Sequence, residues 1–76
     1  MEYQEDIIFI ERITSRIKRL RIERNMTQFD LASKSDMEEN ALQRLERNRT
    51  SPTIKTLLKI ARGLDMKPED FFDFKN

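Results

Sequence analysis

The sequence predicts an all-α fold of five short helices. Apolar residues recur at intervals of three or four along most of the chain, no stretch has the pattern of a convincing strand, and capping residues stand at the expected helix ends. A chain of 76 residues has room for one small core, so we expect residues 1–76 to form a single domain.

The first helix is predicted from apolar residues that fall on one helical face, namely Ile7, Ile10, Ile13, Ile17 and Leu20. Asn25 follows it and is suited to the left-handed position just after a helix. Residues 1–11 form an N-terminal extension of this helix and contain four acids but no base.

The second helix is expected over residues 28–35. Thr27 is its predicted N-cap, and Asp30, three places on, completes a variant capping box. Asp36 ends the helix, because Asp adopts positive φ more easily than most residues other than glycine.

A third helix is expected over residues 38–47. The spacing of the second and third helices, with a three-residue break between them, matches the helix-turn-helix unit. Ala32 is small enough for two helices that cross steeply at close range, and Met37 can fill the angle between them. The hydrophobic underside of the pair is expected to comprise Leu31, Leu42 and Leu45. The third helix would then be the one that enters a major groove.

Two further helices are expected after a short loop. Thr53 caps the fourth, over residues 54–63, and its expected buried stripe comprises Ile54, Leu57, Leu58, Ala61 and Leu64. Pro68 suits the first turn of a short fifth helix that contains Phe71 and Phe72.

The composition excludes several classes of function. The chain has no cysteine and no histidine, so it lacks thiolate ligands, disulfides, the commonest metal ligand and the commonest general base. No nucleophile–base pair and no glycine-rich phosphate loop is present. We therefore expect no enzymatic activity, no metal and no cofactor.

The longest apolar run is four residues, "IIFI" at residues 7–10, far short of the roughly 20 that span a bilayer, and no signal-peptide pattern occurs. A cytoplasmic protein without membrane contact is expected. The net charge is +1, but residues 12–49 hold ten bases and six acids. This uneven distribution favours a polyanionic partner.

The sequence contains two characteristic segments, "IKRLRIERNMTQFDLASKSDM" and "LQRLERNRTSPTIKTLLKIARGLDMKPEDFF". Both resemble the Cro/C1-type helix-turn-helix family, which is also called the xenobiotic-response-element type. The resemblance covers residues 17–72, about three-quarters of the chain. Within the family, the sequence is most similar to the stand-alone controller proteins of restriction–modification systems. The resemblance implies a five-helix lambda-repressor-like fold and double-stranded DNA as the partner. No sensor region is visible, so no small-molecule ligand is expected.

The resemblance also implies roles for individual residues. Gln28 would contact a DNA phosphate. Four side chains of the third helix would face base edges, namely Glu39, Asn40, Gln43 and Arg44. Four residues just after it would hold the DNA backbone, namely Arg47, Asn48, Arg49 and Thr50. Arg21 and Glu46 would form a salt bridge between the first and third helices.

The chemistry of these side chains agrees with the implied roles. Asn40 can bond the N6 and N7 atoms of adenine, and Arg44 can bond O6 and N7 of guanine. Glu39 can accept a hydrogen bond from cytosine N4, although an acid at a helix N-terminus is also favoured by the helix dipole alone. Arg44 has the alternative of being a solvated surface charge.

The sequence thus predicts a homodimeric transcriptional regulator that inserts its third helix into successive major grooves of a roughly palindromic operator. We expect the dimer contact to use residues 66–74, together with Ile7, Ile8 and Phe9. The alternative is an antitoxin-type helix-turn-helix protein that also binds a protein partner, which the apolar and acidic extension favours.

Overall fold

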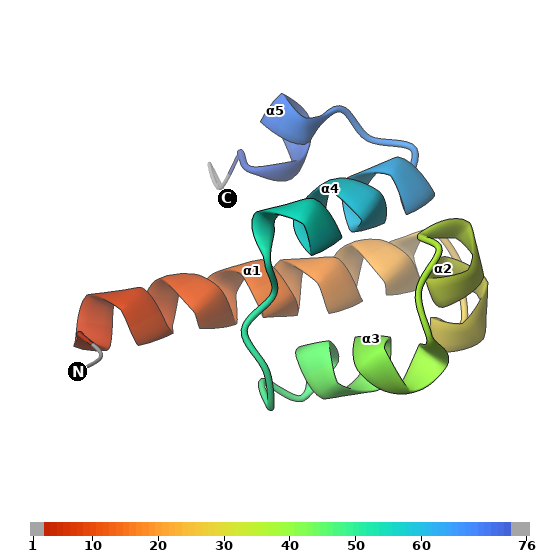
Figure 1. The fold of residues 1–76 in the computed structure, drawn as a ribbon. Coiled ribbons are helices and arrows are strands. Elements are labelled where there is room, and N and C mark those ends of the chain that lie inside the picture. The colour runs from red at the N-terminus through yellow and green to blue at the C-terminus, as the bar shows by residue number, and fades with distance from the viewer. Residues whose placement is uncertain (1–2, 74–76) are drawn as a thin grey trace.

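The computed structural model describes residues 3–73. They form five helices, labelled in Figure 1: α1 (Gln4–Glu23), α2 (Gln28–Lys34), α3 (Glu39–Glu46), α4 (Ile54–Gly63) and α5 (Pro68–Phe71). Over this part of the chain there is no strand, so the predicted all-α fold with five helices is confirmed. None of the helices within residues 3–73 is long and apolar enough to cross a membrane.

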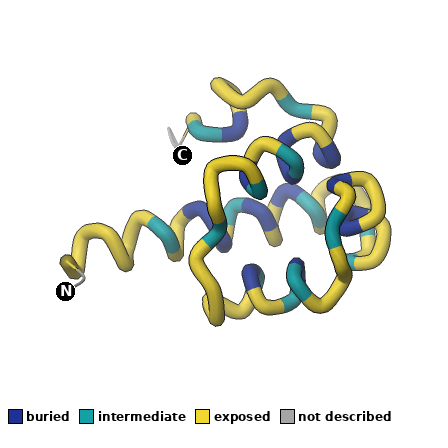
Figure 2. Tube along the Cα trace, viewed as in Figure 1, coloured by how far each residue is buried: buried dark blue, intermediate teal, exposed yellow. Residues whose placement is uncertain are grey.

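One hydrophobic core lies between the C-terminal half of α1 and the other four helices (Figure 2). It comprises Ile13, Ile17, Leu20, Leu31, Ala32, Leu42, Leu45, Leu57, Ile60, Ala61, Leu64 and Phe71. The N-terminal turns of α1 project beyond this core and are exposed, as the yellow tube in Figure 2 shows. Of the five apolar residues on the predicted face of this helix, Ile13, Ile17 and Leu20 belong to the core, whereas Ile7 is exposed and Ile10 is only half-buried.

The buried stripe of α4 also differs from the prediction. Ile60 is fully buried although it was not expected, whereas Ile54 is 68% exposed and Leu58 is 39% exposed. The residues that face the core follow a complete i, i+3, i+4, i+7 pattern, namely Leu57, Ile60, Ala61 and Leu64. Ile54 is the first residue of the helix and lies about 60° from Leu57 around the helix axis, at the border of the buried stripe, and Leu58 is rotated about 100° from Leu57.

The predicted helix starts are confirmed. The Thr27 hydroxyl accepts a bond from the Asp30 amide at 3.0 Å, and the Asp30 carboxylate accepts one from the Thr27 amide at 2.9 Å. The bond from the Thr27 backbone holds the pKa of Asp30 below its ordinary value. Thr53 likewise caps α4 by accepting a bond from the Thr56 amide at 3.1 Å.

The first four helices end in the same way, with a left-handed residue that is not glycine. These residues are Asn25, Asp36, Asn48 and Asp65, with φ of 57°, 53°, 59° and 59°. Asn and Asp tolerate this conformation better than other side chains, which explains their use. The predictions for Asn25 and Asp36 are thereby confirmed.

The next residue after each of these four donates its amide back to the helix, which completes a Schellman motif. At α1, α2 and α4 that residue is a methionine that packs against the core, namely Met26, Met37 and Met66. At α3 it is Arg49, whose amide bonds the Arg44 carbonyl at 2.9 Å and whose side chain is exposed. The end of α3 therefore lacks the apolar contact that secures the other three.

The C-terminal end of α2 packs tightly against α4 at the single glycine of the chain, Gly63. A Cβ atom there would lie 2.2 Å from the Ser35 hydroxyl and 3.2 Å from the Ser35 backbone nitrogen. The Ser35 hydroxyl is buried and has no hydrogen-bond partner within residues 3–73. This packing sets how closely α2, the first helix of the pair, lies on the core.

Candidate nucleic-acid interface

The two helices of the predicted helix-turn-helix unit, α2 and α3, pack against each other. Ala32 is buried where α2 packs into the core, and Met37, in the turn, is half-buried against the same core. The small residue and the apolar plug thus occupy the places that the sequence predicted for them.

The exposed face of α3 is determined by its buried one. Leu42 and Leu45 point into the core, and each residue along a helix turns about 100° from the last. The opposite arc carries Asn40, Gln43, Arg44 and Arg47, of which only Gln43 is half-buried. Glu39 is exposed at the edge of this arc, in the first turn of the helix. The four residues expected to face base edges therefore lie on or beside one accessible surface.

The orientation of α3 is secured by a buried ion pair. The Glu46 carboxylate accepts bonds from Arg21 Nε at 2.7 Å and from Arg21 Nη2 at 2.9 Å. Arg21 Nη1 also donates to the Met26 carbonyl at 2.9 Å. The predicted salt bridge between α1 and α3 is confirmed, and it also holds the turn that leads into α2.

Gln28 joins this network, which the sequence did not predict. Its Nε2 donates to Glu46 Oε1 at 3.0 Å, so one carboxylate ties α1, α2 and α3 together. Because a carboxylate only accepts, the bond determines which end of the Gln28 amide faces inward. The second Nε2 hydrogen and Oε1 remain for a group outside the network.

The four residues after α3 that were expected to hold the DNA backbone are all exposed: Arg47, Asn48, Arg49 and Thr50. Among them, the Asn48 side chain has a partner inside the protein, since the hydroxyl of Thr14 on α1 bonds it. Thr14 is fully buried and also lies 3.1 Å from the Glu11 carbonyl. No feature of the sequence indicated this contact.

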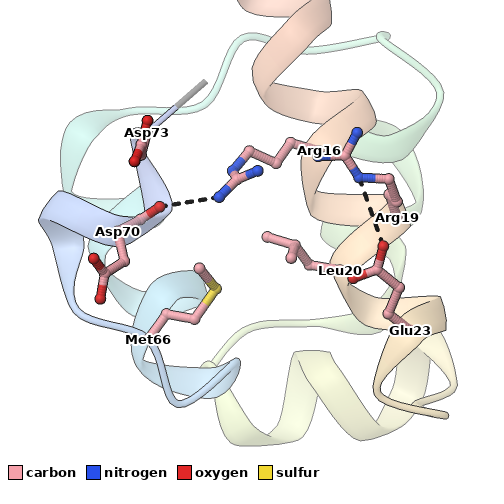
Figure 3. Close-up of a pocket in the computed structure, with 7 residues that line it drawn as sticks. All are labelled: Arg16, Arg19, Leu20, Glu23, Met66, Asp70 and Asp73. Carbon is pink, nitrogen blue, oxygen red and sulfur yellow. Dashed lines mark hydrogen bonds and ion pairs between the residues drawn. The ribbon is translucent and has the colours of Figure 1, made fainter. Parts of the chain in front are cut away.

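Two grooves flank the molecule on different sides. One of about 260 Å³ lies between the projecting turns of α1 and the segment after α3, lined by Ile7, Ile10, Glu11 and residues 48–51. The other, of about 520 Å³, lies between α1 and α5 (Figure 3). There the Arg16 guanidinium donates to the Phe71 and Asp70 carbonyls at 2.8 and 3.0 Å, so it fastens α5 to α1. Figure 1 shows α5 and α3 on opposite sides of the molecule, so the second groove is remote from the exposed face of α3.

Within the described chain, no group of three or more acidic side chains is placed to hold a metal ion.

Comparison with known proteins adds independent observations. A family model described as helix-turn-helix matches residues 17–71. An uncharacterized HTH-type transcriptional regulator of Archaeoglobus fulgidus is 38% identical over 60 residues, which cover 79% of this chain and 84% of the relative.

Among solved structures, the chain is similar to the wild-type restriction–modification controller protein C.Esp1396I. The TM-score is 0.81 and the identity 38%, with 84% of this chain and 83% of that one covered. A tetramer of the same controller protein in complex with its natural 35-base-pair operator matches with a TM-score of 0.81 and 38% identity, covering 84% of each chain.

Proposed function

This chain belongs to the Cro/C1-type helix-turn-helix family, and we propose that it is a transcriptional regulator that binds operator DNA as a homodimer. The observation that carries the proposal is α3 itself. Leu42 and Leu45 anchor one face, the Arg21–Glu46 pair fixes the helix against α1, and the opposite face is polar and accessible. The similar controller protein solved with its operator supports the same role.

Base reading is assigned to the accessible arc of α3. Asn40 and Arg44 lie one helical turn apart, so their amide and guanidinium groups can reach neighbouring base pairs. Gln43 and Glu39 border them and are proposed to read the flanking positions.

Phosphate contact is assigned to the segment after α3 and to the start of α2. The exposed guanidinium groups of Arg47 and Arg49 supply positive charge, and Thr50 supplies a hydroxyl. Asn48 belongs to the same turn. Gln28 would donate its second Nε2 hydrogen to a phosphate, because Glu46 accepts only the first. This contact would position the DNA backbone without neutralising charge.

A homodimer accounts for apolar surface that one chain leaves uncovered. Ile7, Ile8 and Phe9 on α1 are exposed, as is Ile54 on α4. Clusters of large apolar side chains of this kind mark interaction surfaces. We propose that residues 66–74 join them. Phe74 lies outside the described residues, and Phe71 is buried in the core of its own chain. The two α3 helices should then lie about 34 Å apart, one turn of B-DNA.

We also propose a domain organisation, a cellular location and a narrower functional class for this chain. Residues 1–76 would act as one domain in the cytoplasm, without catalytic activity, and a controller protein of a restriction–modification system is the narrower assignment. The sign of regulation depends on where the operator lies relative to a promoter.

A second candidate is an antitoxin-type protein that also binds a protein partner. The projecting, apolar first turns of α1 favour it, because they lie outside the helix-turn-helix unit. Copurification of a stoichiometric partner chain from the native host would support this candidate over the homodimer.

Selection of bound sequences from random duplex DNA at a stated salt concentration tests the proposed function. A palindromic consensus is expected, and it should lose its preference at one symmetric pair of positions when Arg44 is replaced by Ala. Failure to enrich any sequence would argue against an operator-binding role.

A further inference from the structure

The end of α3 is built differently from the other Schellman ends. Where Met26, Met37 and Met66 pack against the core, Arg49 is exposed. A Schellman motif is usually accompanied by an apolar contact between the residue after the left-handed position and the last turn of the helix. Some other contact must therefore hold the turn from which Arg47 and Arg49 project.

The contact between Thr14 and Asn48 is in the right place to do so. Thr14 is fully buried on α1, and Asn48 is the left-handed residue between the two arginines. The bond joins positions 34 residues apart and belongs to no regular helical pattern.

The chemistry of the contact defines its direction. The Thr14 hydroxyl has one hydrogen but lies close to two oxygens, those of the Glu11 carbonyl and the Asn48 side chain. Rotating the Asn48 side-chain amide by 180° exchanges its nitrogen and oxygen, which have nearly the same shape. With this orientation the single hydroxyl hydrogen of Thr14 is sufficient for both contacts. Asn48 Nδ2 then donates to Thr14, and Thr14 donates to Glu11.

We infer that Thr14 is a positioning residue for DNA binding. This inference rests on the proposed phosphate contacts of Arg47 and Arg49. Thr14 itself cannot touch DNA, since it is enclosed by the protein. Through Asn48 it replaces the missing apolar contact and fixes the turn, so that the exposed side chains of Arg47 and Arg49 project from a defined backbone at the end of α3. Its role is to limit the conformations of this turn before DNA arrives.

Binding of a mixed-sequence DNA duplex at several salt concentrations tests the inference, because phosphate contacts are independent of sequence. Thr14→Val keeps the shape of the side chain and removes the hydroxyl, and Asn48→Gly removes the amide but keeps the left-handed backbone. Each should weaken binding several-fold and reduce the salt slope, and Thr14→Ser should recover most of what Thr14→Val loses. Thermal unfolding of each variant identifies a temperature at which all of them are folded, and binding is measured there.

Combination with Arg49→Ala shows whether Thr14 acts through the arginine. In that background Thr14→Val should have a smaller additional effect than in the parent protein, since only Arg47 is left for it to position. If Arg49→Ala weakens binding but Thr14→Val changes neither the affinity nor the salt slope, then Thr14 is only a structural residue. That result would overturn the inference about Thr14 and leave the proposed phosphate contact of Arg49 standing. An unchanged salt slope for Arg49→Ala would instead overturn the proposed phosphate contact and the inference with it.

Discussion

Glu46 and Arg21 form a bidentate ion pair whose side chains are only 2% and 11% exposed. Removal of one partner leaves the other charge desolvated, which costs on the order of 3–5 kcal/mol in buried pairs. Glu46→Gln is therefore expected to lower the free energy of unfolding by roughly 3 kcal/mol, measured by urea or thermal unfolding.

The chain supplies a matched control for this measurement. Arg19 and Glu23 form an ion pair 3.8 Å long on the surface of α1, with side chains 51% and 58% exposed. Glu23→Gln should change the free energy of unfolding by less than about 1 kcal/mol. Equal effects of the two substitutions would show that burial of the Glu46 pair has no energetic consequence.

Arg44 and Arg49 should differ in what they contribute to DNA binding. Arg44→Ala is expected to cost about 1–3 kcal/mol on the selected operator and to relax preference at one symmetric pair of positions. Arg49→Ala should weaken all sequences nearly alike and reduce the salt slope by about one unit. Both are measured by titration at several salt concentrations. If Arg44→Ala leaves operator preference intact, the exposed face of α3 is not the reading surface, and the antitoxin-type candidate gains support.

Glu39 offers a test between base reading and a helix-dipole role. It lies exposed in the first turn of α3, while Glu38 occupies the N-cap position without a side-chain capping bond. If Glu39 accepts from cytosine, Glu39→Ala should loosen specificity at one position of the operator. If it serves only the dipole, overall affinity should rise, because a charge that repels phosphate has been removed. Sequence selection with the variant, alongside affinity, separates the two outcomes.

The capping box of α2 should contribute a pH dependence to stability. The folded-state pKa of Asp30 lies below its ordinary value of 3.8, chiefly because the Thr27 amide donates to the carboxylate. A depressed folded pKa stabilises the protein above the ordinary value, and this contribution is lost as pH falls through the folded-state pKa. The stability difference between the protein and Asp30→Asn should therefore shrink between about pH 5 and pH 2 in thermal unfolding. A difference that is constant over this range would contradict the assignment.

Gly63→Ala should destabilise the fold by about 1–3 kcal/mol, because the new methyl group has no room between α2 and α4. The contact is with the Ser35 hydroxyl, so Ser35→Ala should recover part of the loss. Ser35→Ala alone is expected to cost little or to stabilise, since it removes a buried hydroxyl without a partner in the described chain. Urea unfolding of the two single variants and the double variant provides the measurement.

The sequence was informative wherever a signal is local. Thr27 with Asp30, Asn25 and Asp36 are recognisable because caps and left-handed positions depend on the residue and its near neighbours. The buried face of α4 was partly misjudged, because an apolar residue such as Ile54 satisfies the helical period without facing the core. Periodicity does not show where a helix extends past its neighbours.

Contacts between distant residues were predictable only when a family pattern pointed to them. The Arg21–Glu46 pair came from the resemblance and was confirmed. The bond from Gln28 to the same carboxylate and the bond between Thr14 and Asn48 depend on the three-dimensional arrangement of α1, α2 and the end of α3. A threonine within an amphipathic helix carries no sign of such a partner.

The exposed Arg49 implies a compromise between two kinds of selection. A methionine at this position, as at the other three Schellman ends, would bury apolar surface and strengthen the fold, but it would remove a positive charge from the side proposed to face DNA. Selection for heat resistance would therefore favour an apolar residue at position 49, whereas selection for tight operator binding would favour an arginine there.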